Sequence, residues 1–278
     1  MAILVAQPVP GSLACTMRQI GREFHLFAHL AALKPHPELL AASWALLHES
    51  ILTSVDRVEA ERIAAFVSKA NQCGYLTALH ASILAGLGEF RTACALLTGR
   101  PGEILEQPYR KADRNERNAI LTAHFFSRLA IVLGPNRISL AELWLAYRAA
   151  CKQVLPHRNG SPGTTPASAM DWVRAVGERL GEESLTEAVR LRVVSHIRSW
   201  DGERRAPNRS WVENHLADFS PPDRAAARLA MLVAMAPHQI DSIVVESFCH
   251  AVPDPAVLVA VVGWASTRAL DRLVCLYA

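Results

Sequence analysis

The sequence has no close pair of cysteines. Its six cysteines are scattered along 278 residues, and no two of them are separated by only two positions: Cys15, Cys73, Cys94, Cys151, Cys249 and Cys275. In a chain of this length the scatter is typical of reduced thiols, whereas a small secreted protein would carry an even set at close spacings. The pattern therefore argues against a disulfide framework and predicts a cytoplasmic protein.

Charge is also scarce. Only 20% of the residues are charged, and 29 basic side chains against 26 acidic ones give a formal net charge of +3. Proteins dedicated to nucleic acids carry a clustered basic excess. A few arginines are clustered, namely Arg204 with Arg205 and those near Arg114. We expect these to be solvent-exposed charges in loops. We therefore expect no nucleic-acid partner.

Long hydrophobic runs are missing. The longest, from Ala256 to Ala265, is too short to span a bilayer. The apolar stretch near the N-terminus has no basic residue before it and stops at Pro8, so we expect neither a signal peptide nor a membrane partner. Apolar content is nevertheless high at 51%, which excludes disorder and leaves material for one large domain or two modest ones.

Hairpin signals are absent, and helix signals take their place. No Asn-Gly or Asp-Gly turn separates alternating apolar runs. Ser139 and Ser184 open capping boxes, and Ser220 and Asp254 each precede a proline where a helix would begin. The sequence therefore predicts an all-α fold. Helices are expected near 13–33, 37–53, 56–71, 73–87, 89–98, 113–133, 139–155, 168–181, 185–200, 209–218, 221–236, 239–250 and 255–276.

A Gly- and Pro-rich segment at 156–166 is the strongest predicted loop, and it divides the chain into parts of comparable length. We predict two helical parts, 1–155 and 156–278. Residues 64–68 can be aligned with 191–195, each followed by a further pair of helices. The two parts are therefore either degenerate copies of one unit, or stretches of alanine- and leucine-rich helix that resemble each other by composition.

The residues that carry chemistry lie in one short segment of the first part. Cys73 stands at the start of a predicted helix, where free N–H groups and the positive end of the helix dipole favour a thiolate. Leu76, Thr77 and His80 follow three, four and seven residues later and share one helical face with this cysteine. Glu61, on the preceding helix, has mostly small neighbours on its face. Desolvation there would raise the pKa of its carboxyl toward an acid/base range.

The spacing of Glu61, Cys73 and His80 resembles the alkylhydroperoxidase D-like, carboxymuconolactone decarboxylase family. Its redox members read Glu…Asn-x-Cys-x-Tyr-Cys-x-x-x-His, and residues 71–80 here read Asn-Gln-Cys-Gly-Tyr-Leu-Thr-Ala-Leu-His. The resemblance is specific over about residues 34–98. Beyond these residues, the sequence is similar to longer, apparently duplicated members of the family. It implies an all-α bundle that assembles into homo-oligomers, usually trimers or hexamers.

The departure from that motif decides the expected chemistry. In the redox members the second cysteine attacks peroxide and the first resolves the product as a disulfide, but the second position here is Leu76. Without a neighbouring thiol, Cys73 has no local partner for a disulfide, so the dithiol cycle of the redox members cannot take place. The family's decarboxylase branch works without the cysteine pair and relies on proton transfer involving the equivalent histidine.

We therefore predict a cofactor-free and metal-free enzyme of the lyase or isomerase type. Its catalytic residues would be His80, Glu61 and Cys73. They would promote isomerisation, elimination, decarboxylation or rearrangement of a small oxygenated organic molecule, of the kind met in specialised metabolism and biosynthesis. The alternatives are a one-cysteine thiol peroxidase that uses an external thiol, and a helical scaffold without catalysis.

The resemblance also implies residues that bind the substrate, namely Tyr75, Leu76, Thr77, His124 and Arg128. His124 and Arg128 lie one turn apart in a stretch that lines the pocket in longer relatives. Arg128 is expected to hold an anionic group, or alternatively to form a structural ion pair. In the second part, the positions that align with the three catalytic residues are Ala188, Trp200 and Val212. None of these side chains can act as an acid or a base, so we expect the second part to serve as a scaffold.

Each catalytic assignment has a structural alternative. A free cysteine on a helix is more often a buried apolar residue than a nucleophile, and Tyr75 is alternatively a packing aromatic. His80 is alternatively a hydrogen-bonded core histidine. Glu61 is alternatively a surface charge that pairs with Arg57 or Arg62.

A histidine pair outside this segment has metal-ligand spacing. His25 and His29 are four residues apart, as two ligands on one helix would be. They lack the glutamate of the His-Glu-x-x-His pattern and a third ligand nearby. We therefore predict that they are ordinary helix residues.

Overall fold

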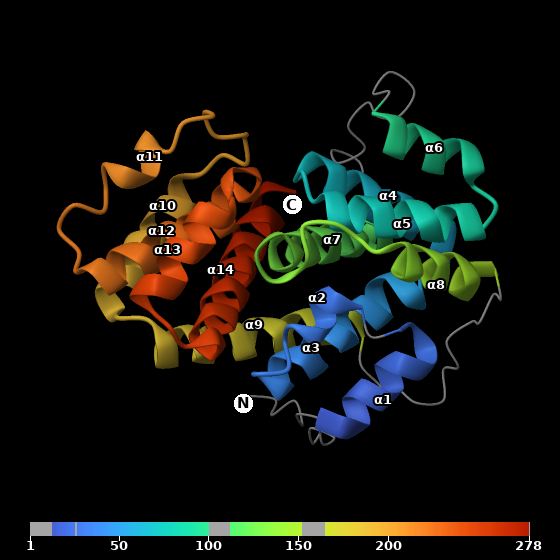
Figure 1. Cartoon of the computed structure of the whole chain (residues 1–278), viewed down its shortest axis with the longest axis horizontal. Coiled ribbons are helices and arrows are strands. Elements are labelled where there is room, and N and C mark those ends of the chain that lie inside the picture. The colour runs from blue at the N-terminus through green and yellow to red at the C-terminus, as the bar shows by residue number, and fades with distance from the viewer. Residues whose placement is uncertain (1–12, 26, 100–111, 152–164, 278) are drawn as a thin grey trace.

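The computed structural model of this chain describes residues 13–25, 27–99, 112–151 and 165–277, which form helices and no strand (Figure 1). The predicted all-α fold is confirmed. In chain order the helices are α1 (Leu13–Glu23), α2 (Ala28–Ala31), α3 (Pro37–Leu47), the π-helical η1 (His48–Leu52), α4 (Arg57–Ala70), α5 (Gly74–Gly86), α6 (Phe90–Thr98), α7 (Arg114–Leu133), α8 (Leu140–Cys151), α9 (Pro166–Ser184), α10 (Glu187–Ser199), α11 (Ser210–Glu213), α12 (Pro221–Met235), the 3-10 turn η4 (Pro237–Gln239), α13 (Ser242–Ala251) and α14 (Pro255–Leu276).

The hydrophobic core runs through both parts of the chain. Helices α7 and α14 pack against each other at the centre of the molecule, and α3 lies against α9 (Figure 1). Helix α4 packs on α5 and α7, and α8 covers α5, while α12 packs on α14 and contacts α10 and α13. One continuous cluster of buried apolar side chains joins these helices. Most of the predicted loop, 156–164, lies outside the described residues, and the division into two copies remains a prediction.

Local capping explains where many helices begin. The side chain of Asp56 accepts a hydrogen bond from the Glu59 N–H, and Ser139 forms the predicted capping box with Glu142. The box predicted at Ser184 is wrong, because that serine is the last residue of α9. Thr186 caps α10 instead, accepting from the N–H of Val189.

The predicted helix 13–33 is interrupted. α1 ends at Glu23, and α2 begins only at Ala28. Between them His25 has a φ of 122°, which no helix residue adopts. His25 and His29 therefore do not share a helix face, and His29 is 2% exposed in the core. The prediction that both are ordinary helix residues is wrong.

A tight turn carries the chain from α4 into α5. The predicted break at Asn71 and Gln72 is present, and Gln72 adopts a φ of 59° in the left-handed region. Cys73 follows as the N-cap residue of α5. The turn folds α5 back along α4, so residues about twenty positions apart face each other between the two helices.

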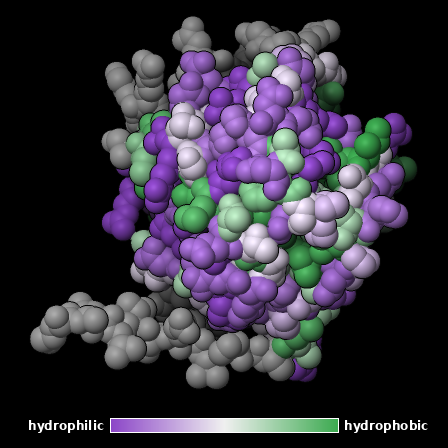
Figure 2. All heavy atoms as spheres, turned by 90° about the vertical axis from the view of Figure 1, so that its left-hand side faces the viewer, coloured by the Kyte–Doolittle hydropathy of each residue, from purple (hydrophilic) through white to green (hydrophobic). Residues whose placement is uncertain are grey.

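Over the second part of the chain, the exposed side is mostly hydrophilic with separate apolar spots (Figure 2). Scattered apolar side chains of this kind are normal on protein surfaces. Among the described helices, none combines the length and apolar character needed to cross a bilayer.

Candidate functional site

Glu61 of α4 and His80 of α5 form a buried pair, hereafter the dyad. The Nδ1 atom of His80 lies 2.6 Å from Oε2 of Glu61, and the two residues are 6% and 1% exposed. An ionised carboxylate only accepts, so Nδ1 of His80 carries the hydrogen and donates it. In the neutral form of this ring the other nitrogen, Nε2, is an acceptor, and no described residue donates to it. The sequence-predicted pair is therefore brought into contact.

Arg57 completes this arrangement one helical turn before Glu61. Its Nε atom donates to Oε1 of Glu61 over 2.7 Å. Burial alone would raise the pKa of the Glu61 carboxyl, but Arg57 and the hydrogen bond from His80 together lower it below its ordinary value. The prediction of a raised pKa is wrong, and Glu61 is an ionised partner for His80 at neutral pH. The alternative role of Glu61 is confirmed in one respect and wrong in the other: the residue does pair with Arg57, but it is buried and not at the surface.

Cys73 is buried at the start of α5 and is not a thiolate at neutral pH. Burial raises the pKa of its thiol to about 11, against the opposing effect of the N–H groups of Leu76 and Tyr75. The prediction that the helix start favours the thiolate is therefore wrong, because desolvation outweighs the N–H groups. Leu76 fills the position of the missing second thiol and is 1% exposed. None of the six cysteines is in a disulfide.

Tyr75 and Thr77 are held by intramolecular hydrogen bonds. The hydroxyl of Tyr75 donates to Oε1 of Glu142 on α8 over 2.9 Å. Thr77 donates its hydroxyl hydrogen to the carbonyl of Cys73 in the preceding turn, also over 2.9 Å. Both side chains are buried, and Thr77 has no hydrogen left to donate to a substrate. Their predicted contact with a substrate remains a prediction.

His29 is a residue that the sequence reasoning missed. Its ring meets the rings of Tyr75 and Phe126 edge to face, with centroids 5.7 and 5.8 Å apart. Its Nδ1 atom is buried without a hydrogen-bond partner among the described residues. Burial and the nearby His80 lower the pKa of His29 to about 3, although Glu142 acts in the opposite direction. The sequence offered only its spacing to His25, which did not indicate this place beside the dyad.

His29 should make the fold labile to acid. The unfolded chain binds a proton at His29 below its ordinary pKa of 6.5, whereas the folded chain does so only near 3. The stabilisation is therefore complete above pH 6.5 and is lost as the pH falls toward 3. At pH 5 the loss from this residue is about 2 kcal/mol.

Urea unfolding at pH 7 and pH 5 tests this expectation with a His29→Phe variant. The variant should lose about 2 kcal/mol less than the parent between the two pH values. His250→Gln, at an exposed position of α13, is the matched control and should lose as much as the parent. Equal losses in all three proteins would contradict a neutral, buried His29.

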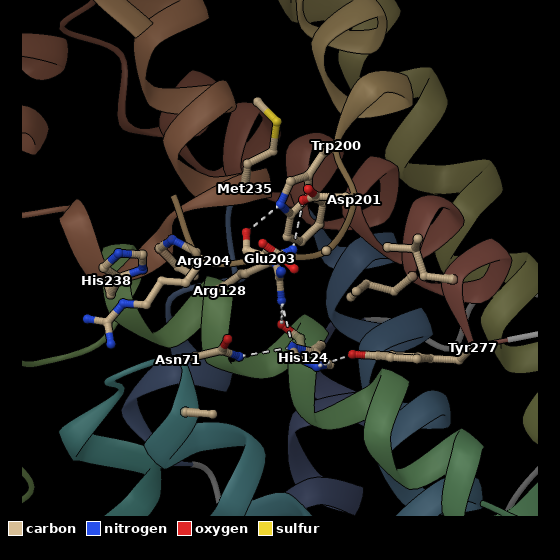
Figure 3. Close-up of a pocket in the computed structure, with 15 residues that line it drawn as sticks. Asn71, His124, Arg128, Trp200, Asp201, Glu203, Arg204, Met235, His238 and Tyr277 are labelled. Atoms are coloured by element: carbon tan, nitrogen blue, oxygen red, sulfur yellow. Dashed lines mark hydrogen bonds between the residues drawn. The ribbon is translucent and has the colours of Figure 1, made fainter. Parts of the chain in front are cut away.

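A second polar cluster surrounds His124 and Arg128 of α7 (Figure 3). Nδ1 of His124 lies 3.1 Å from Nδ2 of Asn71 and 3.1 Å from Nη1 of Arg128. A guanidinium can only donate, so Nδ1 of His124 is the acceptor and Nε2 carries the hydrogen. Nε2 faces the hydroxyl oxygen of Tyr277, and the distance between these two atoms is 3.4 Å. Burial and Arg128 lower the pKa of His124 far below its ordinary value, so the ring is neutral.

Arg128 does not form the structural ion pair that was its alternative role. It is 1% exposed and donates to the carbonyls of His124 and Ala234, at 2.9 and 3.2 Å. No carboxylate of the described residues lies within ion-pair distance of it. The bond to Ala234 joins α7 to the last turn of α12, across 106 positions of sequence.

The His124 cluster lines a cavity of about 900 Å³, and the dyad does not. Its wall includes Asn71, His124, Arg128 and Tyr277, closed by the loop 200–204 and the end of α12 (Figure 3). Glu61, Cys73 and His80 are not among its lining residues. The structure therefore separates the predicted site into two places, the dyad between α4 and α5 and the cavity between the two parts of the chain. Trp200, predicted to be scaffold, is part of this wall.

Within the described part of the chain, no group of three or more histidine, cysteine, aspartate or glutamate side chains is placed to hold a metal ion.

Comparison with curated proteins finds one named alkyl hydroperoxide reductase, from Mycobacterium tuberculosis. It is 27% identical over an alignment 309 positions long, which takes in 95% of this chain and 90% of the relative. The resemblance to the alkylhydroperoxidase D-like family is thereby confirmed over nearly the whole length, including the second part. No family model matches the chain, and no solved structure matches it.

Proposed function

We propose that this chain is an acid/base enzyme built on the alkylhydroperoxidase D-like helical fold, in which His80 moves a proton on a small oxygenated organic substrate. The buried contact of 2.6 Å between His80 Nδ1 and Glu61 Oε2 carries the proposal. A histidine whose ring is oriented by a buried carboxylate is a recurrent arrangement for a general base.

The proposed roles follow from the hydrogen-bond directions. Nε2 of His80 accepts the proton from the substrate, and Glu61 stabilises the imidazolium that results. Arg57 keeps Glu61 ionised, because its guanidinium favours the charged carboxylate. The same Nε2 atom then returns the proton at another substrate position, which amounts to isomerisation, or to a leaving group, which amounts to elimination.

Proton exchange in D₂O tests the proposal even while the substrate is unidentified. A panel of small ketones, keto acids and lactones is incubated with the protein, and loss of C–H signals is followed by NMR. The parent should accelerate exchange in at least one member, and His80→Gln should lower that rate by about 10²- to 10⁴-fold. His250→Gln, at an exposed position of α13, is the control and should keep the parent's rate. Undiminished exchange in a folded His80→Gln variant would exclude the dyad as the base.

Reduction of organic hydroperoxides by Cys73 is the second candidate, and the name of the relative from Mycobacterium tuberculosis favours it. The sulfur of Cys73 would attack the peroxide, giving an alcohol and a sulfenic acid that an external thiol reduces. The buried thiol with a pKa of about 11 weighs against this reaction at neutral pH. Rapid, stoichiometric sulfenic acid at Cys73, detected by mass spectrometry after addition of cumene hydroperoxide, would favour this candidate over acid/base chemistry.

A further inference from the structure

Arg128 is a buried cation whose charge is not balanced inside the described protein. All its hydrogen-bond partners are neutral: the carbonyls of His124 and Ala234 and the ring of His124. The C-terminal end of α12, where Ala234 lies, supplies only about half a negative charge. Burial lowers the pKa of Arg128 to about 10, which still leaves the guanidinium charged at neutral pH. A buried charge without a counter-charge is costly, so an anion beside it would be stabilised.

The space for such an anion exists on the side of Arg128 that faces the cavity (Figure 3). The amide of Asn71 and the His124–Tyr277 pair stand on the same wall and are neutral hydrogen-bonding groups. The lining also includes apolar side chains, among them Met235 at the end of α12 and Leu273 and Leu276 of α14. One end of a ligand would therefore meet charge and hydrogen bonds, and its body would meet hydrocarbon.

The mouth of the cavity limits the charge of that ligand. The exposed loop 201–204 places Asp201 and Glu203 at the rim, against a single Arg204. Two carboxylates would repel a dianion such as a phosphate monoester, whereas one buried guanidinium matches one negative charge. These charges favour a monoanion.

We infer that the cavity between α7, the end of α12 and the end of α14 binds a small organic monocarboxylate, with its carboxylate at Arg128 and its apolar body against Met235, Leu273 and Leu276. This site does not include the dyad, and the inference does not depend on the proposed reaction. The ligand would join the two parts of the chain, because Arg128 belongs to one and Met235 to the other.

Matched acids and amides test the charge requirement. Calorimetric titrations use benzoate and hexanoate beside benzamide and hexanamide, which have the same shapes without the charge. The acids should bind at least ten-fold more tightly than their amides, and Arg128→Gln should remove that difference. The His80→Gln variant should bind the acids as the parent does, which separates this result from the fate of the proposed reaction.

A second variant guards against loss of folding when Arg128 is changed. Ala70 is exposed at the mouth of the cavity, so Ala70→Trp should block the site without touching the guanidinium, and acid binding should fall at least ten-fold. Leu97→Trp, at an exposed position of α6, is the control and should bind normally. Equal affinity for acids and amides, unchanged binding in Ala70→Trp, or no binding of either acid up to about 10 mM would each overturn the inference.

Discussion

Replacing Leu76 by cysteine is expected to turn the chain into a dithiol reductant of organic hydroperoxides, at a rate at least a hundred-fold above that of the parent. The position is already prepared for a thiol. It lies in the first turn of α5, three residues after Cys73 and four before His80, and is 1% exposed. Residues four apart on a helix share a face, so the new sulfur would lie beside the dyad.

The expected gain comes from proton transfer to His80. The dyad would accept the proton of the new thiol, and a positioned general base contributes about 10²- to 10⁴-fold. The resulting thiolate attacks the peroxide and releases an alcohol. Its sulfenic acid then condenses with Cys73 to a disulfide and releases water, and added dithiothreitol restores both thiols. The resemblance to the redox members implies this division of roles between the two positions.

The rate of reduction is measured as the consumption of cumene hydroperoxide, and three further variants serve as comparisons. Leu76→Ser has nearly the same volume as the cysteine variant without the thiol and should stay at the parent's rate. Adding His80→Gln to Leu76→Cys should remove most of the gain. Adding Cys73→Ser removes the partner for the disulfide, so without an added thiol the sulfenic acid at position 76 should persist and be detected by mass spectrometry. A folded Leu76→Cys protein no faster than Leu76→Ser would show that the dyad does not activate a thiol at this position.

The fold was predictable because its signals are local. Caps such as Asp56 and Asp254 act within one helical turn, and the predicted helix starts there agree with the structure within a residue. The interruption between α1 and α2 was not predictable. It involves the positive φ of His25 and the burial of Phe27 and Leu30 in the core, and burial in a core shared with distant segments is not encoded in the local pattern.

The candidate site was predicted in composition but not in electrostatics. The spacing of Glu61 and His80 was enough to place them together, because two antiparallel helices joined by a short turn leave few other arrangements. The pKa of Glu61 and that of Cys73 both departed from expectation, since each depends on competing contributions from burial and neighbours. The position of Arg128 was still harder to predict from the sequence, because its hydrogen-bond partner Ala234 lies 106 positions away along the chain.

Replacing Gly181 by leucine is expected to lower the free energy of unfolding by more than about 3 kcal/mol, a large part of the stability of an ordinary domain. Gly181 lies where α9 crosses α14. A Cβ atom there would lie 2.6 Å from Cγ and Nε1 of Trp264 and closer still to Cδ1. Trp264 is 1% exposed and is among the largest buried side chains, so it has no free space into which to move.

The same crossing repeats this close approach one turn earlier, where a Cβ at Gly177 would lie 2.6 Å from Oγ1 of Thr267. The two glycines let α14 lie close to the α9 backbone over a full helical turn, so room for a leucine at position 181 requires the two helices to move apart. Gly21→Leu, in α1, is the matched control. Nothing lies within 4 Å of a Cβ built at Gly21, and leucine has the better helix propensity, so this variant should be neutral or up to about 1 kcal/mol more stable.

A double-mutant cycle in urea assigns the penalty of the Gly181 variant to the contact itself. Trp264→Leu alone leaves a cavity and should cost about 3 kcal/mol. Combined with Gly181→Leu, the new side chain occupies that space, so the double variant should be more stable than the sum of the two single losses by at least about 1 kcal/mol. Strict additivity would show that the two residues do not meet. The packing of α9 on α14, which joins the second part of the chain to the central helices, would then need another explanation.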